Sequence, residues 1–281
     1  MLLAASDTDA QSHARQGYEY ARQGQLANAE RELRESIRLA PENGLYHSAL
    51  AGILQRGSRL EESAAEYAKA LEGVPKGAMR ERLAAQLEQV DLQWGAELAK
   101  SARYNAGLTL ATDAAQRFPQ SAPVLRMLGY FQSKRRMNVA AVSSYLRALE
   151  LDPSSAEANL GLGMAQSAAG LNVDAVKTLE RFPNDVLHVQ ALGSVLLASG
   201  NAEGARAQFE AALKLNAGLA EAHLQLGNLA LERGDLESAK MHLLAAAPED
   251  SRVHFALSRL YRRTGDAAGA AREMQAFEAA R

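Results

Sequence analysis

The apolar residues of this chain recur three or four positions apart, which is the spacing of one face of a helix. Leu226 and Leu229 show this spacing in one segment, and Leu243 and Ala246 show it in the next. No segment has the strict alternation of apolar and polar residues that is typical of a strand. The pattern therefore predicts an all-α protein.

Two sets of small residues divide the helical pattern into repeats. Successive members of the first set are 34, 44, 34, 34, 30, 34 and 31 residues apart, and each member of the second set follows its partner by twelve residues. The first set is Gly17, Ala51, Gly95, Gly129, Gly163, Gly193, Gly227 and Ser258, and the second is Ala29, Ser63, Gly107, Ala141, Ala175, Ala205, Ala239 and Ala270. Because two helices approach to about 8–9 Å only where their side chains are short, each pair of small residues predicts one helical hairpin.

A glycine marks the turn in five of these hairpins. It stands five residues before the second small residue, at Gly24, Gly170, Gly200, Gly234 and Gly265. Glycine readily adopts the left-handed backbone conformation that ends many helices. We therefore expect a turn at the same position in each of these hairpins.

Residues 220–250, AEAHLQLGNLALERGDLESAKMHLLAAAPED, resemble the tetratricopeptide repeat (TPR). The matching residues are Leu226-Gly227, the turn glycine Gly234, Ala239, Leu243 and Ala246, and residues 122–155 and 186–219 carry the same pattern. The resemblance covers essentially the whole chain. It implies an α-solenoid of stacked antiparallel helix pairs that form a right-handed superhelix, with the first helices lining an inner groove and the second helices on the outside.

The expected organisation is a single TPR-like solenoid over residues 1–281. Its repeats are expected at approximately residues 10–43, 44–77, 78–121, 122–155, 156–185, 186–219, 220–250 and 251–281. The third repeat is ten residues too long, which indicates either an overlong first helix or an extra turn of helix. The fifth is four residues short, because Pro183 stops its second helix right after Phe182.

The amino-acid composition argues against several kinds of partner, binding site and cellular location. The chain has 281 residues, of which 47% are hydrophobic, and its net charge is −2, so neither disorder nor nucleic-acid binding by a broad basic surface is expected. It contains no cysteine, which excludes disulfides and zinc–thiolate sites but suits both cytosol and periplasm. No apolar run is long enough to cross a membrane, and the start MLLAAS is too short for a signal-peptide core. A cytoplasmic location is slightly favoured, with export and removal of a leader as the alternative.

The resemblance places the partner-binding residues at the non-core positions of the first helices. These positions carry cationic and aromatic residues in the first, fourth and eighth repeats and mostly apolar residues in the fifth to seventh. The candidates are Arg15, Tyr18, Arg22, Arg126, Tyr130, Lys134, Glu157, Leu160, Gly161, Met164, Leu187, Leu197, Leu224, Asn228, Leu231, Glu232, Arg252, Phe255, Arg259 and Arg262. Aromatic and Arg side chains supply much of the energy of protein interfaces, and apolar anchors hold helices in grooves. We expect the groove to bind an extended or helical segment of another protein that has apolar anchors flanked by acidic groups.

The stretch NLGLGMAQSAAGLNVDAVKTL, residues 159–179, is rich in glycine but is not a phosphate-binding loop. A dinucleotide fingerprint would require glycine where Gln166 stands, and a strand before it. Gly163 and Gly170 belong to the repeat pattern, whereas Gly161 does not. Its place on the groove-facing side suggests a bare patch of backbone that receives a side chain of the partner.

No catalytic or metal-binding constellation is present in the sequence. The chain lacks the Walker, nucleophile-elbow and H-E-x-x-H motifs, so we expect neither an enzyme nor a cofactor. His13, His47, His223 and His254 share one repeat position and are interpreted as packing residues on successive repeats. His223 and His242 could approach each other within one hairpin, but no carboxylate or cysteine at ligand spacing accompanies them.

The last helical segment, GAAREMQAFEAAR, leaves Met274 and Phe277 where a further repeat would cover them. Terminal repeats usually need a polar outer face. Three explanations are open: the chain self-associates there, a flanking domain has been removed, or the two side chains fold back on the eighth repeat. A structural scaffold that forms homo-oligomers through its terminal repeats and convex face is therefore the alternative to a peptide-binding adaptor.

Overall fold

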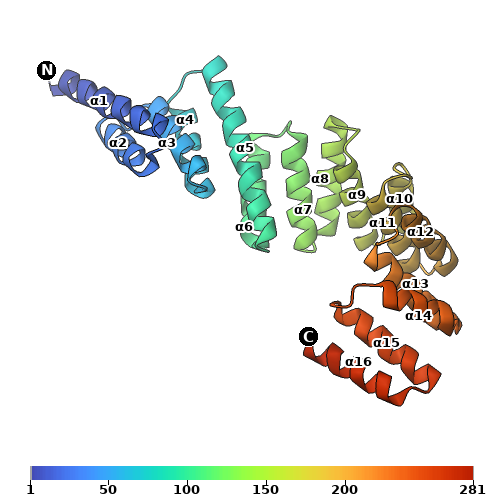
Figure 1. Cartoon of the computed structure of the whole chain (residues 1–281). Helices are drawn as coiled ribbons and strands as arrows, with labels where there is room; N and C mark the ends of the chain where they lie inside the picture. Colours follow the sequence, from blue (N-terminus) through green and yellow to red (C-terminus); the bar gives the residue numbers. More distant parts are fainter. Residues whose placement is uncertain (1, 281) are drawn as a thin grey trace. The chain divides into compact units, whose positions relative to one another are not determined.

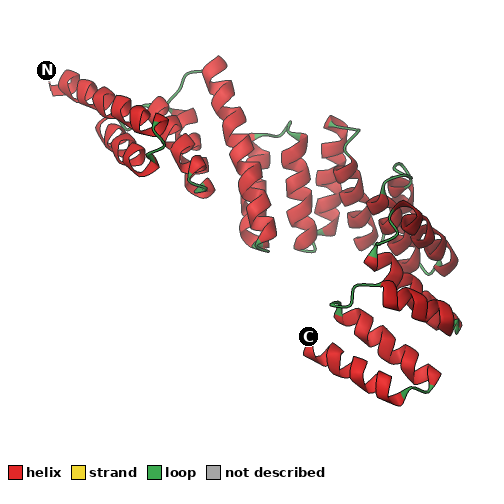
Figure 2. Cartoon of the chain, viewed as in Figure 1, coloured by secondary structure: helices red, strands yellow, loops and turns green. Residues whose placement is uncertain are grey.

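The computed structural model describes residues 2–280, with side chains from Thr8 onward. It divides into two compact units, residues 1–136 and 137–281. No strand occurs in the described part of the chain, which consists of helices and short connections (Figures 1 and 2). None of its helices is both long enough and apolar enough to span a bilayer.

The first unit contains seven helices within its described residues. They are α1 (Leu2–Arg22), α2 (Leu26–Leu39), α3 (Gly44–Arg56), α4 (Leu60–Glu72), α5 (Ala78–Lys100), α6 (Tyr104–Arg117) and α7 (Ala122–Lys134). Each helix packs against the next along the chain. First helices of neighbouring pairs also contact each other, α1 with α3 and α5 with α7.

The second unit contains nine helices up to residue 280. They are α8 (Asn138–Leu151), α9 (Ala156–Ala168), α10 (Asn172–Leu179), α11 (Val186–Ala198), α12 (Ala202–Leu215), α13 (Ala220–Arg233), α14 (Leu236–Ala245), α15 (Ser251–Thr264) and α16 (Ala267–Ala279). Here too each helix packs against the next, and α9 contacts α11 as α13 contacts α15. Each unit is therefore a stack of helices in which neighbours along the chain pack together.

The starts of the observed helices can be compared with the expected repeat ranges, which stay a prediction. The first helix of every repeat from the second to the eighth begins at the first residue of its expected range, as α9 does at Ala156. Only the first repeat differs, because α1 already begins at Leu2. That all eight pairs form one continuous solenoid stays a prediction.

All sixteen small residues of the two sets are buried, which confirms their role at close helix crossings. A Cβ atom added at Gly163 would lie 2.6 Å from Leu179 of the paired helix, and one added at Gly193 would lie 2.8 Å from Phe209. Real Cβ atoms do not approach other atoms this closely. The bulky residue sixteen positions later therefore occupies the space that the missing side chain leaves.

The core is continuous between neighbouring helix pairs within each unit. In the first unit, Tyr67 of α4 packs in one cluster with Leu87 and Val90 of α5. In the second, Leu243 of α14 packs in one cluster with Leu260 of α15. Each pair thus buries its apolar faces only with the help of its neighbour, as in other repeat proteins.

One turn position has a left-handed backbone in all eight repeats. The five turn glycines expected from the sequence have φ angles between 76° and 84°. The same position holds Ser58, Ala102 and Arg136 in the other three repeats, with φ angles of 58°, 54° and 58°. The glycines therefore mark a geometric requirement of the turn that three non-glycine residues also meet, at a cost of about 1–2 kcal/mol each.

The two irregular repeats have simple explanations. Helix α5 runs without interruption for 23 residues, so the long third repeat has one overlong first helix. Helix α10 has only 8 residues and ends at Leu179, shortly before Pro183. The overlong helix agrees with the sequence analysis, whereas α10 ends three residues earlier than the expected end at Phe182.

Candidate functional site

Two hollows lie on the first helices of the second unit, where the sequence analysis placed apolar groove residues. The apolar hollow, of about 350 Å³, lies between α9 and α11. Its lining consists of Leu160, Met164, Ser167, Ala168, Leu187, Gln190, Ala191, Ser194 and Val195. Met164 is 58% exposed and Leu187 is 53% exposed, so two large apolar side chains at its rim face solvent.

The mixed hollow, of about 430 Å³, is lined by residues of α11, α13, α15 and α16. Its lining consists of Leu197, Gln225, Asn228, Leu229, Glu232, Arg252, Phe255, Arg259 and Phe277. Helix α11 contributes to both hollows, through Leu187 and Val195 to the first and Leu197 to the second. The structure thus groups Leu160 with Met164 in one hollow, and Leu197 with Asn228, Phe255 and Arg259 in the other.

The two arginines of the mixed hollow differ in their partners. The Arg252 guanidinium lies 2.6 Å from Asp250 and 2.8 Å from Glu221, and its hydrogen bonds hold the pKa of Asp250 below the usual range. Arg259, one turn beyond Phe255, is half-buried and forms no ion pair with any residue that the structure describes. Arg259 is therefore the cation that this hollow offers to a ligand.

The end of the chain folds back on the eighth repeat. The rings of Phe277 in α16 and Phe255 in α15 are 5.4 Å apart between centroids and inclined by 45°. Phe277 thereby becomes part of the mixed hollow, and Met274 is also half-buried. The ring contact shows that Phe277 folds back on the eighth repeat, which was one of the three explanations for the apolar last helix. Self-association through Met274 and Phe277 stays a prediction.

Two expectations about the groove are wrong. Leu224 is only 2% exposed and, with Leu231, belongs to the core that α13 shares with α15, so neither side chain is available to a partner. The place of a Cβ atom at Gly161 is already filled by the ring of Tyr145 from α8. Gly161 is therefore a packing glycine between consecutive helix pairs, and the space beside its Cα atom is not free to receive a side chain of a ligand.

The candidates of the first unit lie on α1 and α7. Tyr18 is exposed beside Arg15 on α1, and partial burial together with Tyr46 raises its pKa. Arg22 pairs with Glu19 of the same helix at 3.1 Å. On α7, Arg126 is exposed and the Lys134 ammonium lies 5.4 Å from the ring centre of Tyr130 and 5.9 Å from that of Tyr104.

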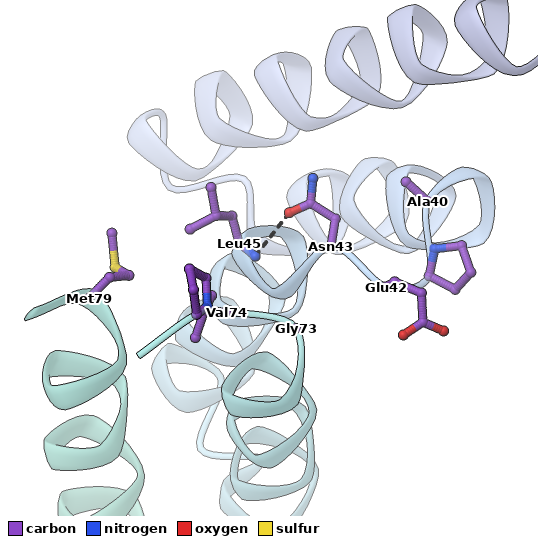
Figure 3. A pocket seen from close by; sticks show the side chains of 9 residues that line it. Ala40, Glu42, Asn43, Leu45, Gly73, Val74 and Met79 are labelled. Atoms are coloured by element: carbon purple, nitrogen blue, oxygen red, sulfur yellow. Dashed lines mark hydrogen bonds between the residues drawn. The ribbon is translucent and has the colours of Figure 1, made fainter. Parts of the chain in front are cut away.

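This unit also has a pocket that the sequence analysis did not predict. The loop pocket, of about 710 Å³, lies between the α2–α3 and α4–α5 connections (Figure 3). Leu45 and Met79, each in the first turn of a first helix, are half-exposed at its rim, and Asn43 Oδ1 accepts a 3.0 Å hydrogen bond from the Leu45 backbone. The only sequence signal for it is the pair Pro41 and Pro75, which recur at the repeat interval in these two loops.

The comparison with protein families decides what kind of repeat this is. The family model of the tetratricopeptide repeat matches residues 15–78, 139–185 and 191–239. The chain belongs to the tetratricopeptide repeat family. No curated protein resembles the sequence closely enough to count as a match.

Solved structures of other TPR proteins share the fold. PilW, a type IV pilus biogenesis factor, has a TM-score of 0.60 and 16% identity, over 69% of this chain and 93% of its own. A TPR protein from Parabacteroides merdae has a TM-score of 0.51 and 17% identity, over 95% of this chain and 99% of its own. YrrB, a TPR protein with an unusual peptide-binding site, has a TM-score of 0.52 and 19% identity, over 72% of this chain and 97% of its own. At these identities the likeness establishes the fold.

The histidines at the shared TPR position pair across their own hairpins. Nδ1 of His13, His47 and His254 lies 2.6–2.7 Å from a glutamate of the second helix, which is Glu32, Glu66 or Glu273 respectively. In the seventh repeat, Nδ1 of His223 lies 3.0 Å from Nδ1 of His242. These histidines therefore form polar pairs inside their hairpins. Residues 8–280 contain no group of three side chains arranged to hold a metal ion.

The His223–His242 contact requires at least one neutral ring. His223 Nε2 lies 3.0 Å from the Ala217 carbonyl oxygen, so it donates there, and between the two Nδ1 atoms one ring donates and the other, neutral ring accepts. Burial and the neighbouring His223 lower the pKa of His242, against the smaller opposing influence of Glu210 on α12 and Asp235 at the start of α14.

The substitution His242→Glu is expected to make the protein less sensitive to acid. The folded-state pKa of His242 lies below 6.5, so the unfolded chain binds more protons as pH falls from 7 to 5, and stability is lost in that range. Glutamate would recreate the His–Glu pair of the other repeats. Urea unfolding at pH 7 and pH 5 should show a smaller loss of unfolding free energy for the variant than for the natural chain. Equal losses would contradict this role of the pair.

Proposed function

We propose that this TPR protein is a non-enzymatic scaffold that binds a segment of another protein on the first helices of its second unit. Membership of the family supports a protein–protein interaction scaffold, because TPR proteins are generally non-catalytic. The observation that carries the proposal is the pair of hollows joined by α11, with exposed Met164 and Leu187 at the first and Phe255 at the second.

These side chains have the chemistry of an interface. Covering large exposed apolar side chains stabilises a complex by about 25 cal/mol for each Å² of apolar surface that the partner removes from water. Aromatic and Arg residues, represented here by Phe255 and Arg259, are enriched among the residues that dominate binding energies. The peptide-binding site named for YrrB is a property of that protein, and it supports a similar use of this fold here.

The substitution Met164→Glu is expected to weaken partner binding at least tenfold. It places a carboxylate in the apolar hollow, where a bound apolar side chain would have to desolvate it. Met241, on α14, is equally exposed at 61% and provides the matched control Met241→Glu. The measurement is quantitative mass spectrometry of proteins retained from a lysate of the source cells by the immobilised natural chain and by each variant.

The same pair of variants tests the alternative, a scaffold that assembles with itself. That alternative has its own support, because Val139, Val173 and Met241 are exposed on second helices. If the chain associates with itself through this face, light scattering should show dissociation in Met241→Glu and not in Met164→Glu. Partner proteins retained equally by Met164→Glu and the natural chain would refute the proposed groove.

A further inference from the structure

We propose, resting on the function above, that the bound segment has a fixed polarity: its apolar part lies on the apolar hollow and an acidic side chain lies on the mixed hollow, against Arg259. The two hollows share α11 and therefore form consecutive parts of one surface. Their chemical characters are different enough to distinguish the two ends of a ligand.

Charge is distributed unevenly along the first helices of the second unit. Helices α9 and α11 contain no Lys or Arg, and Glu157 is their one acidic residue. Helix α15 contains no acidic residue and has four arginines, Arg252, Arg259, Arg262 and Arg263. An apolar segment therefore meets no desolvated cation at α9 and α11, whereas a carboxylate finds its complement at α15.

Arg259 is the arginine of α15 that lines the mixed hollow and forms no ion pair with another described residue. Arg252 is held by Asp250 and Glu221, and the Arg263 guanidinium donates to the Leu231 carbonyl. Arg262 is exposed and does not line the hollow. Arg259 is half-buried in a lining that also contains Phe255, so a carboxylate beside it would experience less screening by water than on an open surface.

The remaining polar groups of the mixed hollow also affect how strongly it would bind a carboxylate. The side-chain amides of Gln225 and Asn228 can donate hydrogen bonds to a carboxylate. Glu232 in the same lining is the one acidic group that opposes an acidic ligand. The proposal therefore makes two predictions of opposite sign, for Arg259 and for Glu232.

The test uses twelve-residue peptides selected from a random phage-displayed library on the full chain. We expect the selected peptides to have an apolar cluster at one end and Asp or Glu at the other. Fluorescence polarisation should show at least tenfold weaker binding to Arg259→Glu and tighter binding to Glu232→Gln. Replacing the acidic residue of the peptide by Lys should restore binding to Arg259→Glu.

The outcomes separate this inference from the proposed function. Peptides that lose affinity with Met164→Glu but are unaffected by Arg259→Glu would overturn the polarity and leave the groove intact. Peptides insensitive to Met164→Glu would count against the groove itself. Arg272→Glu, a charge reversal at an exposed position of α16 outside the hollow lining, controls for a general effect of charge and should leave affinity within twofold.

Discussion

Replacing Asp91 by asparagine is expected to raise the unfolding free energy by about 2–3 kcal/mol at pH 7.5. Asp91 lies in the middle of α5 with none of its surface exposed, and its Oδ1 atom has no hydrogen-bond partner in the described structure. The Arg117 guanidinium contacts the other oxygen at 2.8 Å. Burial outweighs this contact and raises the pKa of Asp91 from 3.8 to about 6. Each pKa unit corresponds to about 1.36 kcal/mol, and an amide carries no charge to bury.

The advantage of Asp91→Asn should shrink as the pH falls. Because the folded-state pKa is raised, the folded chain binds more protons than the unfolded chain between pH 6 and 3.8, and the natural protein gains stability over that range. Urea unfolding at pH 7.5, 6 and 4.5 measures this difference. The control is Glu97→Gln, at an exposed position of the same helix, which should change stability by less than about 0.5 kcal/mol. A variant less stable than the natural chain at pH 7.5 would show that the Arg117 pair outweighs burial.

The substitution Gly107→Ala is expected to destabilise the first unit by about 2–3 kcal/mol. Gly107 of α6 faces the ring of Phe131 in α7, which is completely buried, and an added methyl group would overlap that ring. Overpacking a filled core typically costs about 1–3 kcal/mol, and a buried aromatic ring has little room to move. Circular dichroism during urea unfolding measures the loss.

A second glycine supplies the matched control for Gly107→Ala. Gly52 lies inside α3, and the nearest atom to an added Cβ is 3.8 Å away, on Tyr67. Gly52→Ala should therefore stabilise the protein by about 0.5–1 kcal/mol through its better helix propensity. Adding Phe131→Leu to Gly107→Ala should recover part of the loss. Two alanine variants with equal effects would contradict the close contact at Gly107.

The sequence alone was enough to identify the repeat. Small residues at close crossings and left-handed turn residues are local requirements of every hairpin, so they recur in the sequence as Gly163 and Gly170 do. Pro183 prevents the helix of the short fifth repeat from continuing, although α10 already ends at Leu179. From the second repeat onward, the first helix of each repeat begins where the approximate repeat range begins.

The candidate binding surface was predicted only in part. Met164, Phe255 and Arg259 occupy exposed or half-buried positions of first helices and line the two hollows, as their place in the repeat predicted. Leu224 has a similar place but is buried, because α15 packs against this part of α13. The repeat position does not determine how closely the next helix approaches, and that approach decides which side chains remain accessible.

Sequence by itself therefore determined the fold family, the helix pairs and the set of faces from which a binding surface could be built. Only the tertiary structure decided that Tyr145 covers Gly161, that Phe277 folds back on Phe255, and that Arg259 remains without an ionic partner in the described residues. The physical reason is that periodicity and turns depend on neighbours along the chain. The burial and ionic pairing of a side chain depend on contacts between helices. A local sequence pattern does not predict how closely those helices pack.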